Sequence, residues 1–114
     1  MTQKIPGDLH IANDVLADLA GRAALECYGV VGMSAPDVTD GIAKLLPNSR
    51  FRRGIVVNQT AAGVHVDLYV IIEHGTNITA VSKNLIDQVT FALKNNTGVK
   101  IDAVEVKVQG VRHR

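Results

Sequence analysis

Histidine and cysteine are the residues of this sequence with the most versatile chemistry, because their side chains bind transition metals and act as acids, bases or nucleophiles. The chain has one cysteine, Cys27, and four histidines, at His10, His65, His74 and His113. No two of these five residues lie at the short sequence spacing that is typical of zinc ligands. A metal site would have to be assembled from scattered positions, so we predict no metal and no cofactor, and four imidazoles at the surface or in loops.

Two further groups of residues resemble parts of a catalytic site. Ser34 lies in a context close to the Gly-x-Ser-x-Gly turn of hydrolases, but Pro36 replaces the second glycine. Asp37 and Asp40 could serve as an acid and a base. Their position at the start of a predicted short helix favours a capping role instead. Neither group predicts an enzyme.

Cys27 and the glycines that follow it have structural explanations as well. Cys27 lies near the C-terminal end of a predicted helix, where the dipole raises the pKa of a thiol, so we expect a packed and inert side chain. The segment Gly29-Val30-Val31-Gly32 lacks the lysine and the glycine run of a phosphate-binding loop. The sequence therefore predicts a protein without catalytic activity.

Arginine side chains are the first candidates for binding. Twelve basic and eleven acidic residues leave a formal charge of +1, so any attraction for polyanions has to be local. Clustered arginines can contact phosphates, but they also form solvated surface or salt bridges to a partner. The two clusters are Arg50, Arg52 and Arg53 around Phe51, and Arg112 and Arg114 at the end of the chain.

An exposed sheet face is the second candidate for binding. In the predicted strand 64–73, Tyr69 and Ile71 occupy the odd positions, which we expect to face solvent. A second copy of the chain or another protein could cover this face. RNA-binding sheets stack bases on two or three aromatic residues, and Tyr69 alone does not provide that platform.

The apolar spacing predicts the elements that position these residues. One helix begins after Asn13 and ends near Gly29, a short one runs over 37–46, and a long one begins at Asn77 and ends at Gly98. Strands are predicted at 30–34, 54–60, 64–73 and 100–111, with a hairpin joining the middle two. Residues 47–54 form the loosest segment.

These elements predict an α+β fold. Strands 64–73 and 100–111 each alternate apolar with polar residues, so helices should cover only one face of their sheet. We expect a two-layer domain with a mixed sheet, a central hairpin and helices packed on one face. A length of 114 residues with 46% hydrophobic content fits one domain, 1–114. Residues 1–9 lack the pattern of a secretory signal, so we expect the protein inside the cell.

Three segments resemble one known family when they are taken together. They are Leu-Glu-Cys-Tyr-Gly-Val-Val-Gly-Met at 25–33, Val-Asp-Leu-Tyr-Val-Ile-Ile-Glu-His-Gly-Thr-Asn-Ile at 66–78, and Val-Lys-Val-Gln-Gly-Val at 106–111. In this order they resemble the alkaline-shock-protein, or envelope stress response, family of Gram-positive bacteria. The resemblance spans 11–111 and is closest to the short housekeeping branch.

The resemblance implies a small cytoplasmic domain without known enzymatic activity, linked to cell-envelope homeostasis. Some members are held at the membrane by a separate anchor protein, so a peripheral location through a partner is also implied. Genes of the short branch neighbour a dihydroxyacetone-kinase-like protein associated with fatty-acid phosphorylation. The resemblance provides no catalytic residues to transfer to this chain.

Three functions follow from the residues and the resemblance. The first is a noncatalytic interaction or scaffold module in cell-envelope stress or homeostasis, acting through a protein partner or self-association. The second is a nucleic-acid or other polyanion binder that uses the arginine clusters. The third is a regulator of a lipid-metabolism kinase partner. The candidate interaction surface comprises Arg50, Arg52, Arg53, Tyr69, Ile71, Arg112 and Arg114.

Overall fold

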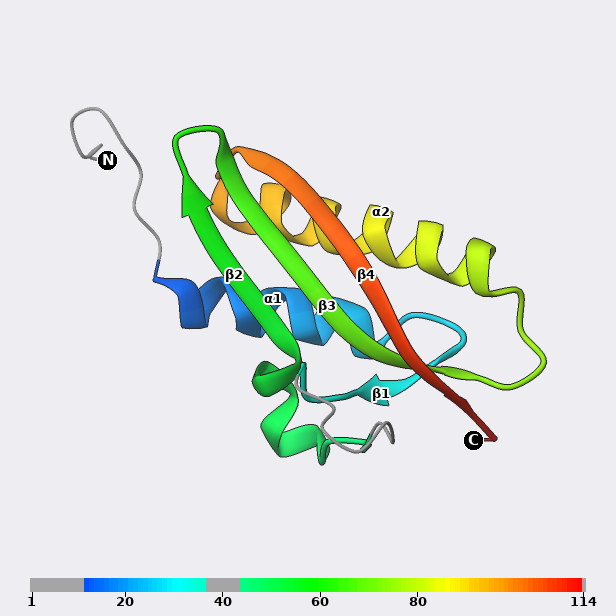
Figure 1. The fold of residues 1–114 in the computed structure, drawn as a ribbon. Coiled ribbons are helices and arrows are strands. Elements are labelled where there is room, and N and C mark those ends of the chain that lie inside the picture. Colours follow the sequence, from blue (N-terminus) through cyan, green and yellow to red (C-terminus); the bar gives the residue numbers. More distant parts are fainter. Residues whose placement is uncertain (1–11, 37–43, 114) are drawn as a thin grey trace.

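The computed structural model describes residues 12–36 and 44–113 (Figure 1). Its elements follow in the order α1 (Asn13–Leu25), β1 (Val30–Met33), a 3₁₀ helix η1 (Asn48–Gly54), β2 (Ile55–Thr60), β3 (Gly63–Glu73), α2 (Ile78–Thr97) and β4 (Ile101–Arg112). The two α-helices cover the same face of the sheet (Figure 1). The predicted two-layer α+β fold is confirmed.

β3 is the centre of the sheet, because every other strand pairs with it. β1 and β2 both run antiparallel to β3, with Met33 opposite Val70 and Val57 opposite Val66. β4 runs parallel to β3, with Val104 opposite Val66. Since a strand has only two edges, β1 and β2 lie end to end along one edge and β4 occupies the other. The sheet is mixed and contains the predicted hairpin.

The core lies between the sheet and the helices. The even-numbered residues 64–72 of β3 are all at most 4% exposed, which is the apolar face that their alternation predicts. Both helices add one buried stripe to this core. Its helical members include Leu16, Ala20 and Ala24 of α1 and Val81, Leu85, Val89 and Leu93 of α2.

α2 begins and ends as its sequence predicts. The Asn77 side chain accepts a hydrogen bond of 3.0 Å from the backbone N–H of Ala80. Gly98 takes a left-handed conformation with φ of 73° and closes the last turn.

The start of α1 differs from the prediction. Ala12, and not Asn13, is the capping residue, and among the described residues no side chain caps this end. Asn13 instead accepts a hydrogen bond of 2.7 Å from Gln59 Nε2, which ties α1 to β2. The Asn13 side chain therefore bonds to Gln59, a residue distant in the sequence, instead of capping the helix as the local pattern predicted.

The segment between β1 and β2 also differs. Most of the predicted short helix, including its capping residues Asp37 and Asp40, falls outside the described residues. The predicted end of this helix is wrong, because Leu45 forms an antiparallel β-bridge with Ser34. Residues 48–54 form η1 instead of a loose loop. The Phe51 ring lies so close to α1 that a Cβ added to Gly21 would lie 2.3 Å from it, so η1 is packed against the helix.

Ile71 is not exposed, contrary to the prediction from alternation. It is 0% exposed although it does not belong to the core between sheet and helices. Its partner on β1 is Gly32, and a Cβ added there would lie 2.6 Å from Leu45 Cδ1. Leu45 therefore lies over this end of the outer sheet face, and the buried Ile71 leaves the candidate interaction surface.

Candidate functional site

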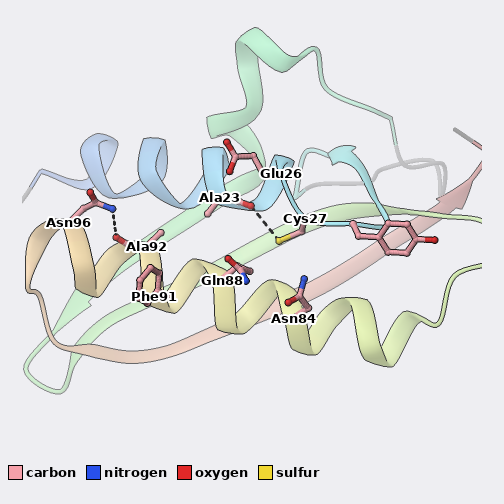
Figure 2. A pocket seen from close by; sticks show the side chains of 9 residues that line it. Ala23, Glu26, Cys27, Asn84, Gln88, Phe91, Ala92 and Asn96 are labelled. Carbon is pink, nitrogen blue, oxygen red and sulfur yellow. Dashed lines mark hydrogen bonds between the residues drawn. The ribbon is translucent and has the colours of Figure 1, made fainter.

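A groove between α1 and α2 is the first candidate site on the helical layer (Figure 2). It has a volume of about 420 Å³. Two aromatic side chains beside it are strongly exposed, Tyr28 at 77% and Phe91 at 65%. The remaining lining is small or polar, consisting of Ala23, Glu26, Cys27, Asn84, Gln88, Ala92 and Asn96. We call these nine residues the helix groove.

Tyr28 and Phe91 are not among the predicted site residues, although the sequence contains one signal for Phe91. Phe91 lies outside the apolar stripe that α2 buries, whose nearest members are Val89 and Leu93. A large aromatic residue on the polar side of an amphipathic helix is unusual, and it marks a surface that another molecule can cover.

Cys27 lines the helix groove as a packed thiol. It is 7% exposed, and its Sγ donates a hydrogen bond of 3.3 Å to the backbone oxygen of Ala23. Burial raises the pKa of this thiol, and the nearby carboxylate of Glu26 raises it further. The raised pKa agrees with the prediction, and burial is its main cause.

Ser34 lacks the accessibility that a nucleophile needs. It is 0% exposed, and its Oγ donates a hydrogen bond of 2.8 Å to Gln109 Oε1. The side chain therefore serves to join the end of β1 to β4.

The arginines around Phe51 form a second candidate site. The described residues include a shallow hollow of about 390 Å³ that is lined by Arg50, Arg52, Arg53 and also Arg22 of α1. Arg52 Nε donates to Asp18 Oδ1 at 2.9 Å, and Arg22 Nη2 lies 3.9 Å from the other oxygen of this carboxylate. Two of the four arginines thus contact the carboxylate of Asp18, and no sequence pattern placed Arg22 among them.

Arg112, near the end of the chain, does not join this hollow. Arg112 is exposed at the end of β4, where its backbone oxygen accepts from the N–H of His74. It is not among the residues that line the hollow. Arg114 lies outside the described residues, so its predicted role stays a prediction.

We expect the arginine hollow to bind nucleic acid only feebly and without sequence preference. Three flexible side chains release few counterions, and no stacked aromatic platform adds its roughly 1–3 kcal/mol per base. The measurement is fluorescence anisotropy of a labelled single-stranded RNA at several salt concentrations, with an Arg50/Arg52/Arg53→Ala variant as comparison. Submicromolar binding at physiological salt that the triple substitution abolishes would make this hollow the functional site.

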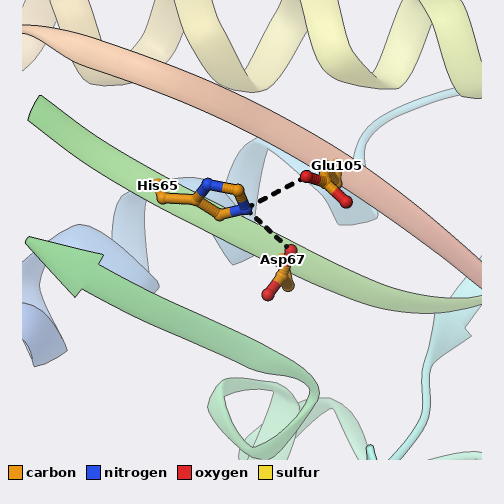
Figure 3. Close-up of side chains that lie close together, drawn as sticks. All are labelled: His65, Asp67 and Glu105. Carbon is orange, nitrogen blue, oxygen red and sulfur yellow. Dashed lines mark hydrogen bonds and ion pairs between the residues drawn. The ribbon is translucent and has the colours of Figure 1, made fainter. Parts of the chain in front are cut away.

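The outer face of the sheet is the third candidate site. Figure 3 shows His65 of β3 pointing to Asp67 of the same strand and to Glu105 of β4. Its Nε2 lies 3.2 Å from Asp67 Oδ1 and 3.3 Å from Glu105 Oε2. Tyr69, which is half-buried, lies opposite Lys107 in the next pair of the same two strands. This face is therefore charged rather than aromatic.

Glu105 and Lys107 form an exposed ion pair beside this cluster. Lys107 Nζ donates to Glu105 Oε1 at 3.0 Å. This hydrogen bond, together with the opposite charge, lowers the pKa of Glu105 and raises that of Lys107. Because both groups are exposed, water screens the pair and it adds little to stability.

The described part of the chain contains no helix that is both long and apolar enough to cross a membrane.

Comparison with known proteins identifies close relatives of the chain. It is 38% identical over 107 residues to the uncharacterized protein YloU of Bacillus subtilis (strain 168), covering 93% of this chain and 89% of YloU. It is 36% identical over 116 residues to the uncharacterized protein Spy1614 of Streptococcus pyogenes serotype M6, covering 98% and 96%. A solved structure of a MamM-CTD double variant matches with a TM-score of 0.49 and 10% identity, over 89% of this chain and 93% of that one.

The family match extends over residues 1–113, and the matching family is described by a cell envelope-related function. It agrees with the resemblance of the three sequence segments. The chain belongs to the alkaline shock protein 23 family.

Proposed function

We propose that this protein is a noncatalytic interaction module that acts in the cytoplasm in cell-envelope homeostasis, and that its helix groove binds an apolar segment of a partner protein. The family supports the link to the cell envelope. The observation that carries the interaction role is the exposure of Tyr28 and Phe91 beside one groove.

The chemistry of the helix groove favours a protein partner. Exposed tyrosine and phenylalanine are enriched at protein interfaces, where they supply rigid contact area. Glu26 is the only charged residue among the nine, so the groove offers nothing that attracts phosphates. Asn84 and Gln88 can form hydrogen bonds with the backbone of a bound segment. An uncharged segment with one or two apolar side chains fits this lining best.

The test is quantitative affinity purification from the native cell with the wild-type chain and a Phe91→Ala variant. A matched control is Val15→Ala, which removes an apolar side chain of α1 that is 47% exposed and does not line the groove. We expect a partner that the control retains and Phe91→Ala loses. With the purified partner, Phe91→Ala should weaken binding by about tenfold or more, as truncation of an interface aromatic residue does.

Other outcomes separate this proposal from its alternatives. Light scattering over a wide concentration range detects self-association, and a dimer that Phe91→Ala dissociates would make the partner a second copy. A lipid-metabolism kinase among the Phe91-dependent proteins would make this protein a regulator of that kinase. Partners that bind wild type and Phe91→Ala equally would overturn the helix groove as the binding site.

A further inference from the structure

The residues His65, Asp67 and Glu105 form a cluster of metal-ligating side chains that is separate from the helix groove. Their ligand atoms all lie within 4.8 Å of one another. His65 and Asp67 are two positions apart on β3, so they share one face, and Glu105 lies directly opposite Asp67 on β4. Three side chains on two paired strands have a rigid support, as a preorganised site requires.

The two distances from the His65 imidazole match those between ligands of one metal ion. His65 Nε2 is 3.2 Å from Asp67 Oδ1 and 3.3 Å from Glu105 Oε2. Two ligand atoms that each bind a tetrahedral zinc ion at about 2.0–2.1 Å lie about 3.3–3.4 Å apart. His65 is therefore already placed to share one ion with either carboxylate, and the two carboxylates lie within 4.8 Å of each other.

Neighbouring residues provide the outer interactions that metal ligands usually have. The other ring nitrogen of His65, Nδ1, lies 3.8 Å from Asp102 Oδ2, which is beyond hydrogen-bond distance but places a carboxylate on the side from which one orients a ligating imidazole. Lys107 holds Oε1 of Glu105 and so leaves Oε2 facing His65. The Lys107 contact thus directs one ligand oxygen, and Asp102 adds a negative charge beside the imidazole.

The charge of the cluster also favours a divalent cation. Three carboxylates, those of Asp67, Asp102 and Glu105, surround His65, and the ammonium group of Lys107 contacts one of them. With a neutral imidazole these groups leave a net charge of −2. A divalent cation neutralises this charge completely, whereas protonation of His65 alone neutralises half of it.

We propose that His65, Asp67 and Glu105 bind a divalent transition-metal cation of the zinc type on the outer face of the sheet. One imidazole nitrogen and two carboxylate oxygens are ligands that suit zinc better than magnesium or calcium, which prefer oxygen alone. Three protein ligands leave a fourth position open to water or to an acidic side chain of a partner.

The test is isothermal titration of the EDTA-treated full chain with zinc chloride in a buffer that does not bind metals. We expect one ion per chain and a rise in melting temperature on zinc addition, since a ligand that binds only the folded state stabilises it. His65→Ala and Glu105→Gln should each lower the affinity by at least about tenfold. The matched control is His74→Ala, which removes an exposed imidazole that stacks on His113 at 4.5 Å and should leave zinc binding unchanged.

Three results would overturn the proposal. The first is the absence of zinc binding in a chain whose circular dichroism shows it folded, which would leave only an ion-pair network around His65. The second is zinc binding that His65→Ala and Glu105→Gln leave unaltered, which would assign it to other histidines. The third is equal competition by magnesium, which would contradict a site for transition metals.

Discussion

Replacing Leu68 with alanine is expected to lower the free energy of unfolding by about 2–5 kcal/mol. Leu68 is 0% exposed at the middle of β3, with Ile55 of β2 on one side and Val106 of β4 on the other. The substitution removes buried apolar surface and leaves a cavity that three paired strands cannot close. Urea unfolding followed by circular dichroism measures this loss.

The matched control is the neighbouring substitution Asp67→Ala, measured with EDTA present so that no cation contributes. Asp67 faces the opposite side of β3, where its side chain is 18% exposed. We expect a change of less than about 1 kcal/mol. Comparable losses for the two variants would show that the two faces of β3 do not separate core from surface.

The second large effect is expected at Gly54, where β1 and β2 meet along the edge of β3. A Cβ added there would lie 2.7 Å from the backbone oxygen of Ser34 and 2.8 Å from Met33 Cβ. Backbone atoms cannot rotate away as a flexible side chain can, so the strands would have to move apart. Gly54→Ala should therefore lower the free energy of unfolding by about 1–3 kcal/mol, as overpacking of a core does.

The control for Gly54→Ala is Ser49→Ala, which changes an exposed residue of the same 3₁₀ helix. Its effect should stay within about 0.5 kcal/mol. Both variants can be compared in the same urea experiment. A Gly54→Ala protein as stable as the wild type would mean that β1 and β2 can separate without cost to the sheet.

The parts of the fold that the sequence predicted depend on local patterns. The alternation in β3 and β4, the Asn77 cap and the Gly98 end of α2 are each encoded within a few residues. The two-layer architecture followed from those patterns, because each of the two strands has one apolar face. The three segments that resemble the family predicted the family to which the chain belongs.

The parts that were not predicted depend on contacts between distant residues. Ile71 is buried at the end of the outer face over which Leu45 lies, and alternation within β3 contains no sign of that cover. The position of Arg22 beside Arg52 depends on how η1 packs against α1. In both cases the local pattern was sound, and a remote segment changed the environment of the residue.

The His65 cluster shows the same limit at a candidate site. The spacing of His65 and Asp67 on one strand was visible in the sequence, but Glu105 is 40 positions from His65. Its place depends on the parallel alignment of β3 and β4, which includes two irregularities and cannot be derived from periodicity. Short spacing along the chain therefore does not reveal this group of three side chains.

The central position of β3 makes slippage of its neighbours improbable. Because β1, β2 and β4 all pair with this one strand, a shift of β3 by a single residue would misalign three ladders at once. The same shift would carry His65 and Asp67 into the apolar layer and bring Val64 and Val66 into water. Any other register of β3 would therefore disturb its pairing with all three neighbours at the same time. This favours a single native arrangement of the sheet over a set of similar ones.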